Sequence, residues 1–334
     1  LGNPYTWVDD NTLLYKSTIS NASAAPKRPI TPKGPTIQQN LGKAAPSPTY
    51  QDLIKSPFDE QLFQFYALSQ LVINKNGVET LSGKPCILSN FSLSPDKKYL
   101  LQKQLQQPFS YLVTANGFPS KMVITDLTGK TIKVLADLPS TEGTPSGYDN
   151  TQNVPRSFDW RDDEASTITW AEPLDSGLIK KQVEFRDAIY ALSAPFSGNP
   201  SLLFKTKLRY GGTTWGNENI ALVSEISRSK QLVRVNLFNS NKGSVELMLE
   251  RNQTDAYGNP GSPVTSKNKY GRNVITTIEN GTKLLMNNTT GSSPNGDLPF
   301  LAKFDLNTKQ NEIIWRANPG VFEYVVEVLD ANNL

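Results

Sequence analysis

Short runs of alternating apolar and polar residues, separated by polar turns, cover most of the chain. In the clearest case, 156–172 (RSFDWRDDEASTITWAE), two β-prone stretches flank an acidic turn. Val, Ile, Thr and aromatic residues in such runs, bounded by Asp, Asn, Ser or Gly, are typical of a half-buried β-hairpin. The same plan recurs in five places along the chain: 5–16, 91–103, 156–172, 213–225 and 276–287.

A second hairpin pattern with a Gly or Asn/Lys turn follows each of these five. The second patterns lie at 71–81, 122–135, 189–204, 233–249 and 302–315. Two hairpins make four strands, and four-stranded units that recur at roughly 40 to 50 residues, with loop insertions, are typical of β-propeller blades. The chain therefore predicts an all-β fold, a β-propeller of four-stranded antiparallel blades rather than a sandwich. Five blades are recognisable, and 321–330 (VFEYVVEVLD) predicts a strand of a partial sixth.

An insertion at 20–69 interrupts the first blade. Its first part is rich in proline, which removes backbone donors and disfavours helix and ladder alike. A helix is predicted after it, with Ser56 as N-cap, Pro57 in the first helical position and acidic residues in the first turn. The insertion is either a flap or docking arm or simply a long loop. We expect one domain, 1–334, with strands of the parent propeller missing at both ends.

Composition excludes several classes of function. The 334 residues carry a net charge of +3 without a dense basic run, which indicates neither nucleic-acid nor membrane binding. Histidine is absent, so a Ser-His-Asp or Cys-His catalytic set cannot be assembled from this chain alone. Cys86 is the single cysteine and lies in an apolar setting typical of a packed thiol. We predict no catalytic residue, no cofactor and no metal in this chain.

Two residue clusters have both a functional and a structural interpretation. The acidic turns at 9–10 and 162–164 offer oxygen ligands for calcium, but they lack a D-x-D-x-D-G loop, which favours ordinary turn formation. Tryptophans recur at strand positions, and we favour packing between blades over a carbohydrate-stacking surface. These tryptophans are Trp7, Trp160, Trp170, Trp215 and Trp315.

Several loops resemble one known family. The matching segments are LGNPYTW at 1–7, the insertion at 27–71, QPFSYLV at 107–113, PRSFDWR at 155–161, DAYGNPGSPV at 255–264 and GDLPFLAKFDL at 296–306. They resemble the amino-terminal propeller of glutamyl endopeptidase-like (dipeptidyl aminopeptidase or acylaminoacyl peptidase type) members of the prolyl oligopeptidase family of serine peptidases. The resemblance implies a carboxy-terminal α/β-hydrolase domain as partner and peptides as substrates. The chain itself contains no G-x-S-x-G motif and no histidine.

The sequence therefore predicts a non-catalytic β-propeller that gates and positions peptides for the hydrolase domain of a serine peptidase. Within it, the resemblance implies that Arg156 contacts an acidic substrate side chain, while a salt bridge to Asp159, Asp162 or Asp163 is the structural alternative. Two other functions stay open: a stand-alone protein-interaction propeller, and a propeller glycoside hydrolase that uses two carboxylates. For location, the resemblance leaves two alternatives open: a periplasmic or secreted bacterial protein, or a plastid-targeted plant protein.

Overall fold

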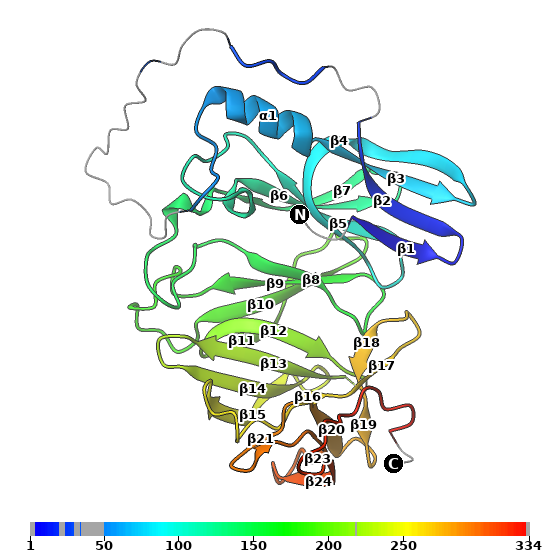
Figure 1. Cartoon of the computed structure of the whole chain (residues 1–334), viewed down its shortest axis with the longest axis vertical. Helices are drawn as coiled ribbons and strands as arrows, with labels where there is room; N and C mark the ends of the chain where they lie inside the picture. Colours follow the sequence, from blue (N-terminus) through cyan, green and yellow to red (C-terminus); the bar gives the residue numbers. More distant parts are fainter. Residues whose placement is uncertain (1–3, 20–23, 30–33, 35–49, 218, 332–334) are drawn as a thin grey trace. The chain divides into compact units, whose positions relative to one another are not determined.

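The computed structural model describes residues 4–19, 24–29, 34, 50–217 and 219–331 (Figure 1). The chain divides into two compact units, 1–155 and 156–334. Antiparallel strands dominate both units, accompanied by one α-helix and two short 3-10 turns in the described residues. The prediction of a mostly β protein built from hairpins is confirmed.

The first unit is a single meander in which each strand pairs with the next. Its seven strands run in the order β1-β2-β3-β4-β5-β6-β7. Their bounds are β1 Tyr5–Asp9, β2 Thr12–Thr18, β3 Ser69–Lys75, β4 Val78–Leu93, β5 Tyr99–Leu105, β6 Ser120–Asp126 and β7 Thr131–Leu138. Strand β4 pairs with β3 through residues 78–86 and with β5 through 87–93. It therefore serves two successive four-stranded groups, β1–β4 and β4–β7.

The turn between β3 and β4 shows how the local sequence sets the register. Asn76 and Gly77 both have positive φ, 51° and 85°. A two-residue turn with two positive φ values matches the right-handed twist of the flanking strands, and Asn-Gly is its preferred sequence. Lys75 consequently pairs with Val78 and Asn74 with Glu79.

Helix α1, Pro57–Ala67, comes between β2 and β3 along the chain. These two strands are nevertheless hydrogen-bonded neighbours, since Thr18 of β2 pairs with Ser69 of β3. Ser56 caps the helix as predicted, accepting a bond from the Asp59 N–H, and Pro57 opens it. Phe63 packs edge-on against the rings of Phe109 and Phe118. The helix is thus anchored by aromatic contacts to the loop between β5 and β6. The prolines predicted to be extended at 32, 35, 46 and 48 lie outside the described residues.

The second unit contains three sheets that follow one another along the chain (Figure 1). The first has the order β11-β10-β9-β8, with β8 Arg156–Trp160, β9 Thr167–Pro173, β10 Asp187–Ser193 and β11 Ser201–Thr206. The second has the order β12-β13-β14-β15, with β12 Arg209–Trp215, β13 Ile220–Ser227, β14 Leu232–Asn239 and β15 Ser244–Asn252. Each is a four-stranded meander, as the paired hairpins predict.

The third sheet of this unit is built around β20, Lys283–Asn288. Its other strands are β16 Ser262–Pro263, β19 Thr277–Ile278, β23 Phe300–Asp305 and β24 Asn311–Arg316. Because β23 pairs along the whole of β20, the short strands β16 and β19 share the opposite edge of β20. The edge strand of this sheet is therefore split into two pieces, β16 and β19. Two small ribbons accompany the sheet, β17 Thr265–Lys267 with β18 Asn273–Ile275 and β21 Ser292–Ser293 with β22 Gly296–Asp297.

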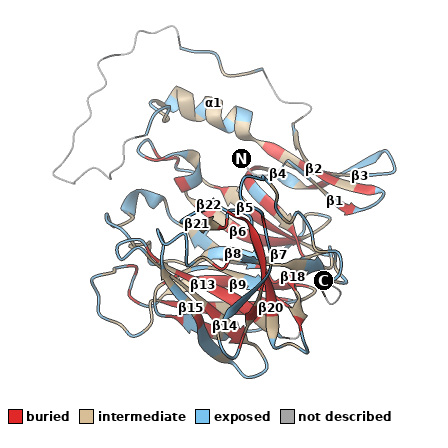
Figure 2. Cartoon of the chain, turned by 60° about the horizontal axis from the view of Figure 1, so that its bottom comes forward, coloured by how far each residue is buried: buried red, intermediate tan, exposed pale blue. Residues whose placement is uncertain are grey.

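Successive sheets of the second unit bury apolar faces against each other. Figure 2 shows the buried residues concentrated on central strands such as β9, β13 and β20. Phe204 of β11 meets Phe238 of β14 with ring centroids 4.7 Å apart, which joins the first two sheets. Met248 of β15 packs with Leu284 and Phe304 of the third sheet. Aromatic and aliphatic side chains that are pointed into such interfaces supply most of the burial energy.

Two sequence predictions are wrong. Residues 321–330 form no strand, since they run as irregular backbone held by the Asn287 Nδ2 bond to the Val325 carbonyl and by packing of Val325 and Val328 against the last core cluster. Contacts at every third residue cannot satisfy the alternation of a strand. Trp7 is 58% exposed on β1, whereas the tryptophans at 160, 170 and 215 are buried as expected.

Candidate functional site

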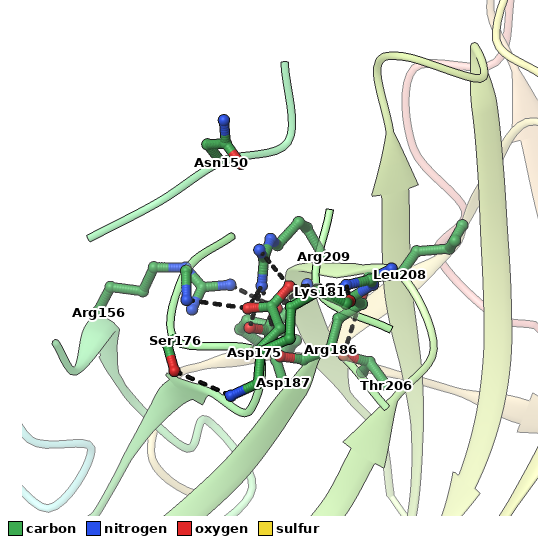
Figure 3. A network of polar contacts seen from close by, with 12 residues as sticks. Asn150, Arg156, Asp175, Ser176, Lys181, Arg186, Asp187, Thr206, Leu208 and Arg209 are labelled. Carbon is green, nitrogen blue, oxygen red and sulfur yellow. Dashed lines mark hydrogen bonds and ion pairs between the residues drawn. The ribbon is translucent and has the colours of Figure 1, made fainter. Parts of the chain in front are cut away.

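Arg156, the predicted substrate-contact residue, belongs to a largely buried network of ion pairs in the second unit (Figure 3). It lies on β8, and its Nη2 donates to Asp187 of β10 at 2.5 Å. Asp187 is fully buried, whereas the Arg156 side chain keeps 22% of its exposure. The partner of Arg156 is therefore a residue that is distant in sequence, on the second strand along in the same sheet.

The predicted alternative partners of Arg156 are bound elsewhere. Asp163 pairs with Arg161 at 2.6 Å, and Asp162 lies 3.9 Å from Arg272. Asp159 accepts a bond from the N–H of Trp160. Arg156 is therefore ion-paired, as the structural alternative predicts, but the predicted partners nearby in sequence are wrong. Asp187 is within reach of Arg156 because β8 and β10 both pair with β9.

Arg209 carries the network from one sheet to the next. It lies on β12, and its Nη1 donates to Asp187 at 3.2 Å and to Asp175 Oδ1 at 2.9 Å. Its Nη2 donates to Asp175 Oδ2 at 2.7 Å, completing a bidentate pair. Bidentate guanidinium–carboxylate pairs are strong because two parallel charge-assisted bonds share one geometry. Figure 3 shows both aspartates lying among the arginines.

Arg186 completes the set by donating to Asp175 at 3.0 Å. Three guanidinium groups thus face two fully buried carboxylates, and the cluster carries excess positive charge. One of its nitrogens, Arg156 Nη1, is buried and has no hydrogen-bond partner in the described residues. Such an unsatisfied donor costs free energy unless a partner reaches it. No pattern in the sequence singles out Asp175, Arg186, Asp187 or Arg209, because only the packing of the sheets brings them together.

A basic groove of about 270 Å³ is lined by β11 of the first sheet and by β13, β14 and β15 of the second. Lys205, Lys207 and Arg234 line it together with one carboxylate, Glu225. Glu225 accepts bonds from the N–H groups of Lys207 (3.1 Å) and Leu208 (2.8 Å) and from the Asn236 amide (2.7 Å). Burial raises the pKa of Glu225 above its usual range despite these donors. The groove can attract an acidic group but holds no arrangement for bond cleavage.

No group of three or more Asp, Glu, His or Cys residues suited to a metal ion occurs in the described part of the chain. Cys86 is half-buried and packs against the first core cluster, and burial raises the pKa of its thiol. Asp9 accepts the N–H of Asn11 at 2.9 Å, as the turn interpretation predicts. Within the described residues, no helix has the length and apolar character needed to cross a membrane.

Comparison with known proteins gives the relationship of the chain. It is 36% identical over 97% of its length to the probable chloroplastic glutamyl endopeptidase of Arabidopsis thaliana, and 35% identical over 97% to that of Oryza sativa subsp. japonica. The chain is homologous to plant glutamyl endopeptidases. It spans only 35% and 36% of the lengths of these two relatives. No family model matches it.

Solved structures resemble this chain more weakly. A Bacteroides ovatus protein described as a dipeptidyl aminopeptidase IV has a TM-score of 0.48 and 11% identity, covering 95% of this chain and 40% of that one. The acylaminoacyl peptidase of Pyrococcus horikoshii has a TM-score of 0.39 and 11% identity, covering 74% of this chain and 35% of that one. Likeness at these TM-scores is too weak to assign a fold, so the architecture rests on the strand pairing of the chain itself.

Proposed function

We propose that this chain is the β-propeller region of a glutamyl endopeptidase-like serine peptidase and that it positions peptides without cleaving them. The observation that carries the proposal is the homology, which covers nearly all of this chain but about a third of its relatives. Successive four-stranded meanders that pack face to face support the propeller architecture, with each group as one blade.

Catalysis in this proposal belongs to residues outside the chain. The 334 residues contain no histidine, so the general base of a Ser-His-Asp triad must come from elsewhere. The predicted partner is an α/β-hydrolase domain, which would supply the nucleophile and the base. The contribution of the propeller region is to restrict access to peptides and to orient them.

The first test compares peptide hydrolysis by the 334-residue chain with hydrolysis by a full-length glutamyl endopeptidase-like protein that contains it. We expect no turnover by the chain and turnover by the full-length protein that a serine-directed reagent abolishes. Reagent-sensitive hydrolysis by the isolated chain would overturn the proposal. Binding of a partner protein by the chain, without activity in the full-length protein, would instead favour an interaction propeller.

Arg156 is the residue that we propose to contact an acidic substrate side chain. Its unpartnered Nη1 supports this role, because a substrate carboxylate would supply the missing acceptor. In the full-length protein, Arg156→Met should reduce kcat/KM for a Glu-containing peptide by about tenfold or more relative to its Gln counterpart. Asp187 keeps its bond to Arg209 in this variant. Arg251→Met, at a position that bonds only backbone carbonyls in the described residues, is the control. An equal loss for both peptides would assign Arg156 a purely structural role.

A further inference from the structure

A cavity of about 600 Å³ lies within the first unit, where strand β4 passes from one four-stranded group to the next. Its walls come from the bend of β4 at 82–86, from β5, and from the turn that joins β6 to β7. This volume is within the range of about 300 to 1,000 Å³ that small-molecule sites occupy. The cavity belongs to neither the arginine network nor the basic groove, which both lie in the second unit.

Two glycines that line this cavity are in close contact and hold one of its walls in place. A Cβ on Gly129 would lie 2.0 Å from the Gly83 nitrogen, and both glycines have positive φ. The Gly83 N–H donates to the Thr128 carbonyl at 3.0 Å, and the Ser82 hydroxyl donates to the Leu127 carbonyl at 2.7 Å. Backbone-to-backbone contact of this kind holds a wall more rigidly than side chains on a free loop.

Two glutamine side chains bring unused hydrogen-bonding capacity to the cavity. Gln102, only 5% exposed, donates one amide bond to Thr125 at 2.9 Å and accepts one from Gln104 at 2.8 Å. A primary amide has two N–H donors and two acceptor positions. Each of the two amides therefore has a second N–H without a side-chain or backbone partner in the described residues. Gln102 is buried beside the apolar wall that Leu71 and Leu88 supply, so a ligand that accepts from its second N–H would add a hydrogen bond there.

The charged side chains that line the cavity are two lysines, and both are exposed to solvent. Lys84 and Lys130 are among its lining residues, all of which the structure describes, and no Asp or Glu is among them. Neither lysine forms an ion pair within the described part of the chain. The nearest acidic residue in sequence, Asp126, is attracted electrostatically to Lys130 and accepts bonds from the N–H groups of Thr128 and Lys130. Two ammonium groups beside unused amide N–H donors are suited to an oxyanion rather than to a cation.

We propose that this cavity binds a small organic oxyanion, a carboxylate or phosphate that also carries hydroxyl or amide groups. Lys84 and Lys130 would meet its charged group, and the amides of Gln102 and Gln104 would meet its neutral polar groups. The carboxylate and the phosphate share the chemistry that the lining recognises. This site is independent of the proposed role in peptide positioning.

Cys86 lines the same cavity and is the single cysteine, so its alkylation rate reports occupancy directly. The test measures alkylation of Cys86 by a maleimide in the 334-residue chain at constant ionic strength, with citrate, glucose 6-phosphate or glucose added. At a concentration tenfold above its dissociation constant, a bound oxyanion should slow alkylation about tenfold. Protection by citrate alone assigns a carboxylate, and protection by glucose 6-phosphate alone assigns a phosphate.

The variant Lys84→Met/Lys130→Met should weaken the protecting ligand by about tenfold or more, because both charge-assisted bonds are lost. The matched control, Lys75→Met/Lys133→Met, removes two lysines of the same unit that do not line the cavity and should leave protection unchanged. Circular dichroism of each variant checks that it is folded. Protection by glucose equal to that of the oxyanions, unchanged protection in the cavity variant, or no protection by any compound would each overturn the proposal.

Discussion

Asp187 of β10 accepts a hydrogen bond from Arg209 of β12 at 3.2 Å, so a fully buried carboxylate in one sheet is ion-paired to the first strand of the next. The backbone N–H of Tyr210, the residue after Arg209, donates to the same carboxylate at 2.7 Å. The Asp187 carboxylate thus accepts both a charged side-chain donor and a backbone donor from β12. The two sheets are joined by this polar contact as well as by the apolar interface around Phe204 and Phe238.

Replacing this carboxylate should destabilise the second unit strongly. Asp187→Asn leaves Arg156 and Arg209 without their shared charge partner, and breaking a buried ion pair from one side costs about 3 to 5 kcal/mol. Urea unfolding followed by tryptophan fluorescence measures the change in the free energy of unfolding. Asp137→Asn, which removes an exposed partner of Lys121 at 4.0 Å, is the control and should change stability by less than about 1 kcal/mol. Equal effects of the two substitutions would show that the network adds nothing.

The close approach of the two cavity glycines predicts a contrast between two substitutions with the same backbone strain. Gly77 and Gly129 have φ of 85° and 84°, but a Cβ on Gly77 meets open space, whereas one on Gly129 meets the backbone of Gly83. Gly77→Ala should cost only the left-handed penalty, about 1 to 2 kcal/mol. Gly129→Ala should cost clearly more, because the bend of β4 must move. Thermal unfolding of both variants measures the two losses of stability. Equal losses would contradict a rigid contact between Gly83 and Gly129.

The cap of α1 predicts a local effect. Ser56→Ala removes the acceptor of the Asp59 N–H, which should lower the stability of the helix by about 1 kcal/mol. Ser56→Gly keeps a residue type that is favourable at this position and should cost only a few tenths of a kcal/mol relative to Ser. Hydrogen exchange of amides within Pro57–Ala67 reports the difference, while exchange in β5 and β6 should be unchanged. Faster exchange in both strands would indicate that the helix supports the sheet.

Glu225 predicts a pH dependence of stability. Burial raises its pKa in the folded state, so the folded protein holds this proton more tightly than the unfolded chain does. The resulting stabilisation is complete below the ordinary carboxyl pKa and is lost as pH rises through the raised value, by about 1.4 kcal/mol for each unit of difference. As the pH rises from about 4 to about 7, the free energy of unfolding of the Glu225→Gln variant should therefore fall less than that of the unsubstituted chain. The free energy of unfolding of both proteins is measured in urea over this pH range. The same slope against pH for the two proteins would contradict the prediction.

The sequence by itself determined the ten hairpins from which the sheets are built. Every one of the ten predicted hairpins is present, because strand alternation and turn residues such as Asn76-Gly77 act over a few neighbouring positions. The capped start of α1 was predictable for the same reason, since Ser56, Pro57 and Asp59 interact within one turn.

Tertiary structure alone decided the partner of Arg156 and the position of the cavity. Asp175, Asp187 and Arg209 meet through packing between sheets, and no local pattern records which of several arginines reaches which carboxylate. The shared strand β4 depends on the contact between Gly83 and Gly129, which are 46 positions apart by their numbering. Residues 321–330 have strand-forming composition but form none, because a strand also needs a neighbour to accept its hydrogen bonds. Turns, caps and strand alternation depend on neighbouring residues and can be predicted from the sequence. Contacts between distant residues depend on which surfaces the folded sheets bring together.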